Sequence, residues 1–110
     1  MLLFVDTEQF AEDLQAMGSA ERDRAYERVS QWFVENSAAI GSGSKLQPPE
    51  TATTVRMEGG DPVITDGPFV EGKEVVSGYV EIDVANLDEA LSMVKKWPGC
   101  PVVEIRPLES

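Results

Sequence analysis

The sequence predicts a single α+β domain that spans residues 1–110. Three observations indicate this fold class. An apolar run at 1–5 and an alternating segment at 77–84 have the patterns of β-strands. Apolar side chains within 20–39 recur with the 3.6-residue period of an amphipathic helix. A chain of 110 residues is long enough to bury one core between such strands and helices.

The first part of the chain is expected to form one strand and two helices. Residues 1–5 are short, apolar and followed by a charged side chain, as in a buried strand. Residues 7–17 carry apolar side chains at helical spacing, and Gly18 is expected to end this helix. Ser19 is expected to cap the clearest amphipathic helix, 20–39.

A connection and a β-hairpin are expected next. Residues 41–50, GSGSKLQPPE, are rich in Gly, Ser and Pro and are too few to separate two domains. The runs 53–57 and 62–65 favour β-structure and flank a turn that contains two glycines. This pattern predicts a hairpin.

A strand, a helix and a further strand complete the chain. Apolar and polar side chains alternate in 77–84. Asn86 and Glu89 have the spacing of a capping-box-like pair at the start of a helix, and residues 102–106 form the last strand. The order β, helix pair, hairpin, β, α, β predicts a ferredoxin-like antiparallel sheet with helices on one face and an inserted β-hairpin.

The opposite face of this sheet has no covering layer in the predicted arrangement. Its expected side chains are those of Arg56, Tyr79, Glu81, Glu104 and Arg106. One interpretation places Glu81 opposite Arg106 as a cross-strand ion pair. The alternative is that a homodimer covers the face, because apolar surfaces need a partner layer, and that Tyr79, Glu81 and Arg106 then contact a ligand in a closed cavity.

Charge and residue content exclude several classes of function. The 9 Lys and Arg against 20 Asp and Glu give a net charge of −11, so no basic surface is expected to bind nucleic acid or anionic membranes. The chain has no histidine and one cysteine, Cys100, which disfavours a metal site, and no cofactor is expected. No signal peptide or membrane helix is expected, which favours the cytoplasm.

A tight corner at Asp66-Gly67-Pro68-Phe69 invites two interpretations. As a turn, Gly67 takes a positive φ, Pro68 fixes its own φ, Asp66 accepts hydrogen bonds from the backbone, and Phe69 is buried. As the edge of a site, the corner directs Asp66, or Glu71, Lys73 and Glu74 in the loop that follows, into a pocket at the sheet edge. Asp66 would then be a catalytic base.

The sequence resembles the YCII-related (YciI-like), or DGPF-domain, proteins. The resemblance covers nearly the whole chain and depends on KLQPPETATTVR at 45–56, ITDGPFVEGKEVVSGYVEIDV at 64–84, NLDEAL at 86–91 and VEIRPL at 103–108. It implies a ferredoxin-like domain of the dimeric α+β-barrel superfamily. Gly67, Pro68, Phe69 and Gly78 match the motif, and structural roles are expected for them. The histidine–aspartate pair of one branch of the family has no counterpart here.

Three functions follow as expectations. The first is a homodimeric accessory domain that binds a small molecule. The second is a cofactor-independent lyase or isomerase that uses a carboxylate base, and whether the chain is an enzyme at all is left open. The third is an interaction module for an extracytoplasmic-function sigma factor, which the resemblance suggests.

Overall fold

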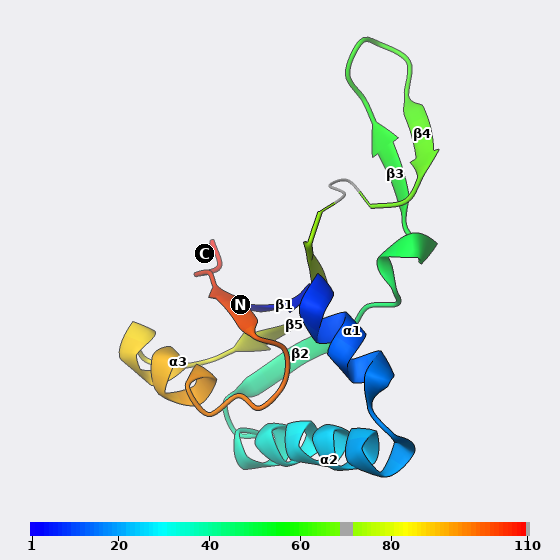
Figure 1. Cartoon of the computed structure of the whole chain (residues 1–110). Coiled ribbons are helices and arrows are strands. Elements are labelled where there is room, and N and C mark those ends of the chain that lie inside the picture. The colour runs from blue at the N-terminus through cyan, green and yellow to red at the C-terminus, as the bar shows by residue number, and fades with distance from the viewer. Residues whose placement is uncertain (69–71, 110) are drawn as a thin grey trace.

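The computed structural model describes residues 1–68 and 72–109 and has the predicted α+β class (Figure 1). Its elements are β1 (Leu2–Thr7), α1 (Glu8–Ala16), α2 (Ser19–Glu35), β2 (Ile40–Lys45), the 3-10 turn η1 (Pro49–Thr51), β3 (Thr53–Arg56), β4 (Val63–Asp66), β5 (Glu74–Ile82), α3 (Leu87–Val94) and β6 (Val102–Ile105). Four strands form an antiparallel sheet in the order β2-β5-β1-β6, and β3 pairs with β4 in a separate small sheet.

The helices and the four-stranded sheet share one hydrophobic core. Leu2 of β1 pairs with Val80 of β5 and Ile105 of β6, so these three side chains lie on one face of the sheet. The buried core comprises Leu2, Phe4, Trp32, Val80 and Cys100. Each helix contributes to it through Phe10, Phe33, Met93 and Val94. The three helices therefore pack on the same face.

The helix boundaries follow local capping chemistry. Asn86 Oδ1 accepts a hydrogen bond from Glu89 N at 3.0 Å, which confirms Asn86 as the cap of α3. The prediction for Ser19 was wrong, because Gly18 occupies the N-cap of α2 and Ser19 is its first helical residue. This helix also ends earlier than expected, at Glu35. No helix within residues 1–68 and 72–109 is both long and apolar enough to span a bilayer.

Strand β2 lies where the sequence predicted a connection. Residues 40–45 pair with β5, and Leu46 N continues the contact by donating to Ser77 O at 2.9 Å. The strand was missed because its glycines and serines have low β-propensity. The glycines have a packing role, however, since a Cβ on Gly43 would lie 2.6 Å from Tyr79 O. Only glycine allows β2 to approach β5 this closely.

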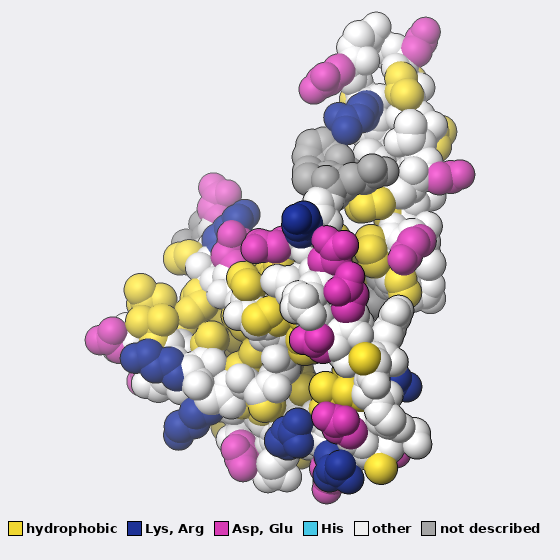
Figure 2. Space-filling view, in the orientation of Figure 1, with side chains coloured by type: hydrophobic (Ala, Val, Ile, Leu, Met, Phe, Trp, Pro, Cys, Tyr) yellow, Lys and Arg dark blue, Asp and Glu magenta, His cyan; other side chains and the backbone are white. Residues whose placement is uncertain are grey.

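Strands β3 and β4 form a hairpin that projects from the body of the domain (Figure 1). We refer to residues 53–66 as the arm. The predicted hairpin is confirmed, but Arg56 lies in the arm and not on the face of the larger sheet. Hydrophobic side chains reach the surface of the arm (Figure 2), where Val55, Met57, Val63 and Ile64 are 51% to 67% exposed.

The helix-free face of the four-stranded sheet carries the predicted polar side chains in a different arrangement. Tyr79 lies opposite Leu3, and so does Glu104. The predicted pair of Glu81 with Arg106 is wrong, because β1 lies between β5 and β6. Instead, Arg106 Nη2 lies 2.6 Å from Oε2 of Glu104, a residue of the neighbouring strand end in β6. Both partners are largely exposed, so this ion pair contributes little to stability.

Candidate functional site

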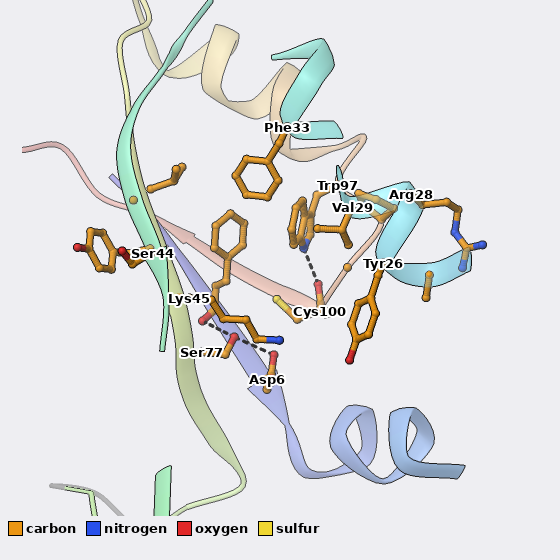
Figure 3. A pocket seen from close by; sticks show the side chains of 18 of the residues that line it. Asp6, Tyr26, Arg28, Val29, Phe33, Ser44, Lys45, Ser77, Trp97 and Cys100 are labelled. Atoms are coloured by element: carbon orange, nitrogen blue, oxygen red, sulfur yellow. Dashed lines mark hydrogen bonds between the residues drawn. The ribbon is translucent and has the colours of Figure 1, made fainter. Parts of the chain in front are cut away.

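A cavity of about 470 Å³ lies between α1, α2 and the helix-covered face of the sheet (Figure 3). Both helices, β1, β2, β5 and the loop after α3 contribute to its wall. Its apolar lining includes Phe4, Phe10, Leu14, Met17, Val29, Phe33 and Trp97. Small-molecule sites are typically clefts of about 300–1,000 Å³ with apolar walls and few polar groups. This cavity is therefore the candidate functional site.

Aromatic rings fix one wall of the cavity. The Phe4 and Trp97 ring centroids lie 4.5 Å apart, and those of Trp32 and Trp97 lie 4.9 Å apart with the rings nearly perpendicular. Buried indoles need hydrogen-bond partners. Trp32 Nε1 donates to Met93 O at 3.0 Å, and Trp97 Nε1 donates to Cys100 O at 3.1 Å. Both indoles are thus held in place, and Trp97 presents ring surface to the cavity.

Three polar side chains lie at one side of this apolar cavity, and we refer to Asp6, Lys45 and Ser77 as the polar corner. Ser77 Oγ donates a hydrogen bond to Asp6 Oδ1 at 2.9 Å. Lys45 Nζ lies 5.7 Å from the centroid of the Tyr26 ring, which is within cation–π range. Figure 3 shows Lys45 directed toward the same part of the cavity as Asp6 and Ser77.

An irregularity in β5 explains how Ser77 reaches the polar corner. Phe4 pairs with Gly78 but the next residue, Val5, pairs with Val76, so Ser77 is the extra residue of a β-bulge. Bulges commonly redirect a side chain beside a functional site. Gly78 beside it is closely packed, since a Cβ there would lie 3.1 Å from the Ser44 carbonyl oxygen, a tight contact. The motif glycine therefore has a packing role.

Cys100 borders the cavity as a buried free thiol. Burial raises the pKa of this thiol above its ordinary value of 9.0, and the negative charge of Asp6 adds to the rise, against an opposing hydrogen bond with Trp97. Thiolates are the reactive form of cysteine, so this environment favours an unreactive, protonated group. Across residues 1–68 and 72–109, no three His, Cys, Asp or Glu side chains are placed to bind a metal ion.

The predicted Asp66–Phe69 corner lies at the base of the arm, away from the cavity. Gly67 has a φ of +106°, which confirms its predicted conformation. Gly67 N donates to Ala52 O at 2.7 Å, and Thr54 Oγ1 donates to Gly67 O at 2.6 Å. Asp66 is the exposed last residue of β4 and does not line the cavity. These hydrogen bonds hold Gly67 against Ala52 and Thr54. Within residues 1–68 and 72–109 none is made by the Asp66 carboxylate, so its predicted role as a backbone acceptor stays a prediction.

The other residues predicted around this loop also lie outside the cavity. Pro68 is half-buried, whereas Phe69 and Glu71 lie outside the described residues. Lys73 and Glu74 are exposed at the start of β5, where Lys73 O accepts a hydrogen bond from Glu8 N at 2.8 Å. This contact joins the loop to α1 through the backbone and leaves both side chains at the surface.

The strand residues predicted to bind a ligand do not meet in one place. Tyr79 borders the cavity, but its side chain belongs to the face opposite that of Val80, since neighbours along a strand alternate. Glu81 shares that helix-free face. Arg106 follows β6, which β1 separates from β5 in the strand order. A ligand role for these three residues would require a second copy to enclose the face.

Sequence reasoning missed all three members of the polar corner as site residues. The sequence indicates Asp6 only as the charge that ends the first strand. Lys45 lies in residues 41–50, which the composition predicts to be a connection. Ser77 is a polar residue that follows two valines in β5. The only signal in the sequence was a serine at a position where the strand pattern would continue with an apolar residue. The bulge that directs its side chain inward is not visible in the sequence.

The fold and the cavity together define a class: an α+β domain with a small-molecule-sized cavity between its helices and its antiparallel sheet. The chain is 37% identical over 84 residues to an uncharacterized protein of Rhizobium meliloti (strain 1021). The alignment covers 73% of this chain and 67% of that protein. The chain belongs to the same family as this Rhizobium protein. No family model matches the sequence.

Proposed function

We propose that this chain is a small-molecule-binding domain and that the cavity between α1, α2 and the sheet is its binding site. The observation that carries the proposal is a cavity of about 470 Å³ with a mainly apolar wall and the polar corner at one side. Such a site removes the body of a ligand from water and orients it through a few polar groups. The elements that form the wall also form the hydrophobic core, which keeps the site in shape.

The same proposal places the domain in the YCII-related, or DGPF-domain, family. The motif at 64–84 supports this assignment, with Gly67 in the conformation that a tight corner needs. The strand order β2-β5-β1-β6, with α1 and α2 after β1 and α3 after β5, supports a ferredoxin-like plan of the dimeric α+β-barrel superfamily. The β3–β4 hairpin is then the insertion.

A homodimer is part of the proposal. All three helices pack on one face of the four-stranded sheet, which leaves Leu3 and Tyr79 on a face without a helical layer. The arm adds exposed apolar side chains, and an isolated two-stranded hairpin is marginally stable without a covering surface. Light scattering should therefore give twice the 12.0 kDa chain mass, and a monomer at micromolar concentration would contradict the dimer.

The binding site is tested by filling the cavity from helix α2. Ala25 lines the cavity, so Ala25→Phe should occupy part of its volume. Ala20, on the same helix, is exposed and does not line it, which makes Ala20→Phe the matched control. The chain, purified from its expression host, is examined by native mass spectrometry and screened by thermal shift against small apolar molecules.

A ligand at about 100 times its Kd should stabilise wild type and Ala20→Phe by roughly 2.7 kcal/mol. The same ligand should have little effect on Ala25→Phe. If a saturable ligand binds Ala25→Phe as tightly as wild type, the cavity is not its site. If no compound binds wild type and none co-purifies, the proposed function is wrong.

A further inference from the structure

We propose that the cavity selects a neutral, mainly apolar molecule with one head group, a hydroxyl or a primary amide, that binds Asp6 and Lys45 at the same time. This inference rests on the proposed function and assigns the chemistry of its ligand. The head group would lie at the polar corner, and the apolar body would lie against the aromatic and aliphatic wall.

The polar corner presents one acceptor and one donor to the cavity. Asp6 Oδ1 accepts from Ser77 Oγ at 2.9 Å, whereas Asp6 Oδ2 accepts no hydrogen bond from the described parts of the chain. Lys45 carries three N–H donors, and its Nζ lies over the Tyr26 ring at 5.7 Å from the centroid. A hydroxyl group can donate to a carboxylate oxygen and accept from an ammonium group at once. A primary amide can do the same through its NH₂ and its carbonyl oxygen.

The charges of the corner favour a neutral head group over an ionic one. Asp6 and Lys45 offset each other, so an anion would meet the carboxylate and a cation would meet the ammonium. Arg28 also borders the cavity but extends away from the polar corner in Figure 3. The net charge of −11 further opposes the approach of anions.

The rest of the cavity wall favours a particular chemistry for the apolar part of the ligand. Phe10, Phe33 and Trp97 line the cavity with ring surface, and Met17 and Val29 add aliphatic surface. Rings stack favourably on aromatic side chains, and methionine adapts to ligands of irregular shape. An aromatic or alicyclic body would therefore bury its surface here without leaving polar atoms unpaired.

Four probes with one carbon skeleton test the head group: 2-naphthalenemethanol, 2-methylnaphthalene, 2-naphthoate and 2-naphthylmethylammonium. Their Kd values are measured with the full chain at pH 7 by isothermal titration calorimetry or by quenching of probe fluorescence. A hydrogen bond to a charged group strengthens binding by about tenfold or more. Wild type should therefore bind the alcohol at least about tenfold more tightly than the hydrocarbon and than either ion.

Two variants assign this preference to the polar corner. Asp6→Asn leaves Lys45 as the charge of the polar corner and should shift the preference toward 2-naphthoate. Lys45→Met leaves Asp6 and should shift it toward 2-naphthylmethylammonium. Exposed residues outside the cavity provide the matched controls Asp83→Asn and Lys96→Met, which should keep the order of wild type. Opposite shifts in the two variants are not expected from a loss of stability.

The outcomes separate this inference from the function on which it rests. If all four probes bind wild type equally and Ala25→Phe abolishes their binding, the cavity binds ligands but the head-group inference is overturned. Unchanged probe order in Asp6→Asn and Lys45→Met overturns it as well. If no probe binds wild type saturably, the head-group inference is overturned, whereas the proposed function is decided by the wider ligand screen and the Ala25→Phe variant.

Discussion

Replacing Gly43 by alanine should detach the strand that carries Lys45. A Cβ at this position would lie 2.6 Å from Tyr79 O and 2.6 Å from Val80 Cγ2, which is closer than side-chain atoms approach one another. One of these atoms belongs to the backbone of β5, so a rotamer change alone cannot remove the clash. Strand β2 must therefore move away from β5 in Gly43→Ala.

The size of the effect follows from two terms. Forcing an extra methyl group into a packed site costs roughly 1–3 kcal/mol, and each backbone hydrogen bond lost if β2 separates costs about 0.5–1.5 kcal/mol. We expect Gly43→Ala to lower the free energy of unfolding by about 2–3 kcal/mol. In a domain of this size, such a loss corresponds to a melting temperature lower by roughly 8–12 °C.

Gly41→Ala is the matched control on the same strand. The nearest atom to its added Cβ is Glu81 O at 3.5 Å, an ordinary contact, so its stability should change by less than about 1 kcal/mol. Urea unfolding, followed by the fluorescence of the two tryptophans, measures both variants. Equal stability of Gly43→Ala and Gly41→Ala would refute the close approach of β2 to β5.

Three further predictions concern the corner and the buried thiol. Asp66→Asn should change the melting temperature little, with a stability change of about 1 kcal/mol or less, because Asp66 is exposed; a larger loss would contradict a purely turn-forming role. Gly67→Ala should cost more than about 1 kcal/mol, because its φ of +106° is unfavourable for alanine, and unchanged melting would contradict this. The free energy of unfolding should fall as pH rises above 9.0, because the unfolded Cys100 thiol ionises there while the folded thiol keeps its proton. Urea unfolding at pH 8 and 10 tests this, and an equal fall in Cys100→Ala would contradict it.

Much of the fold could be predicted because it depends on local patterns. The alternation within 77–84 identified β5, and the apolar period within 20–39 identified α2. The hairpin followed from two β-rich runs around glycines. Strand β2 could not be predicted this way. Gly43 is needed there because the strand lies close to the backbone of β5, which is far away in the sequence.

The candidate site was not predictable to the same degree. The Asp66 corner has conspicuous turn chemistry, which drew attention to residues that hold a turn at the base of the arm. The polar corner depends on a bulge at Ser77 and on a lysine in an unrecognised strand. The cavity itself depends on how far α1 and α2 stand from the sheet, a distance that no periodicity encodes.

The position of β2 has a consequence for association with other chains. The strand order places β2 at the outer edge of the sheet, and such edges can recruit strands from other chains. Its register is irregular between Ile40 and Gly43, and Lys45 places a charge at its end. Both features are known to make an edge a poor template for aggregation. The irregular register and Lys45 are therefore expected to limit pairing of β2 with strands of other chains, whereas Gly43 serves the close approach to β5.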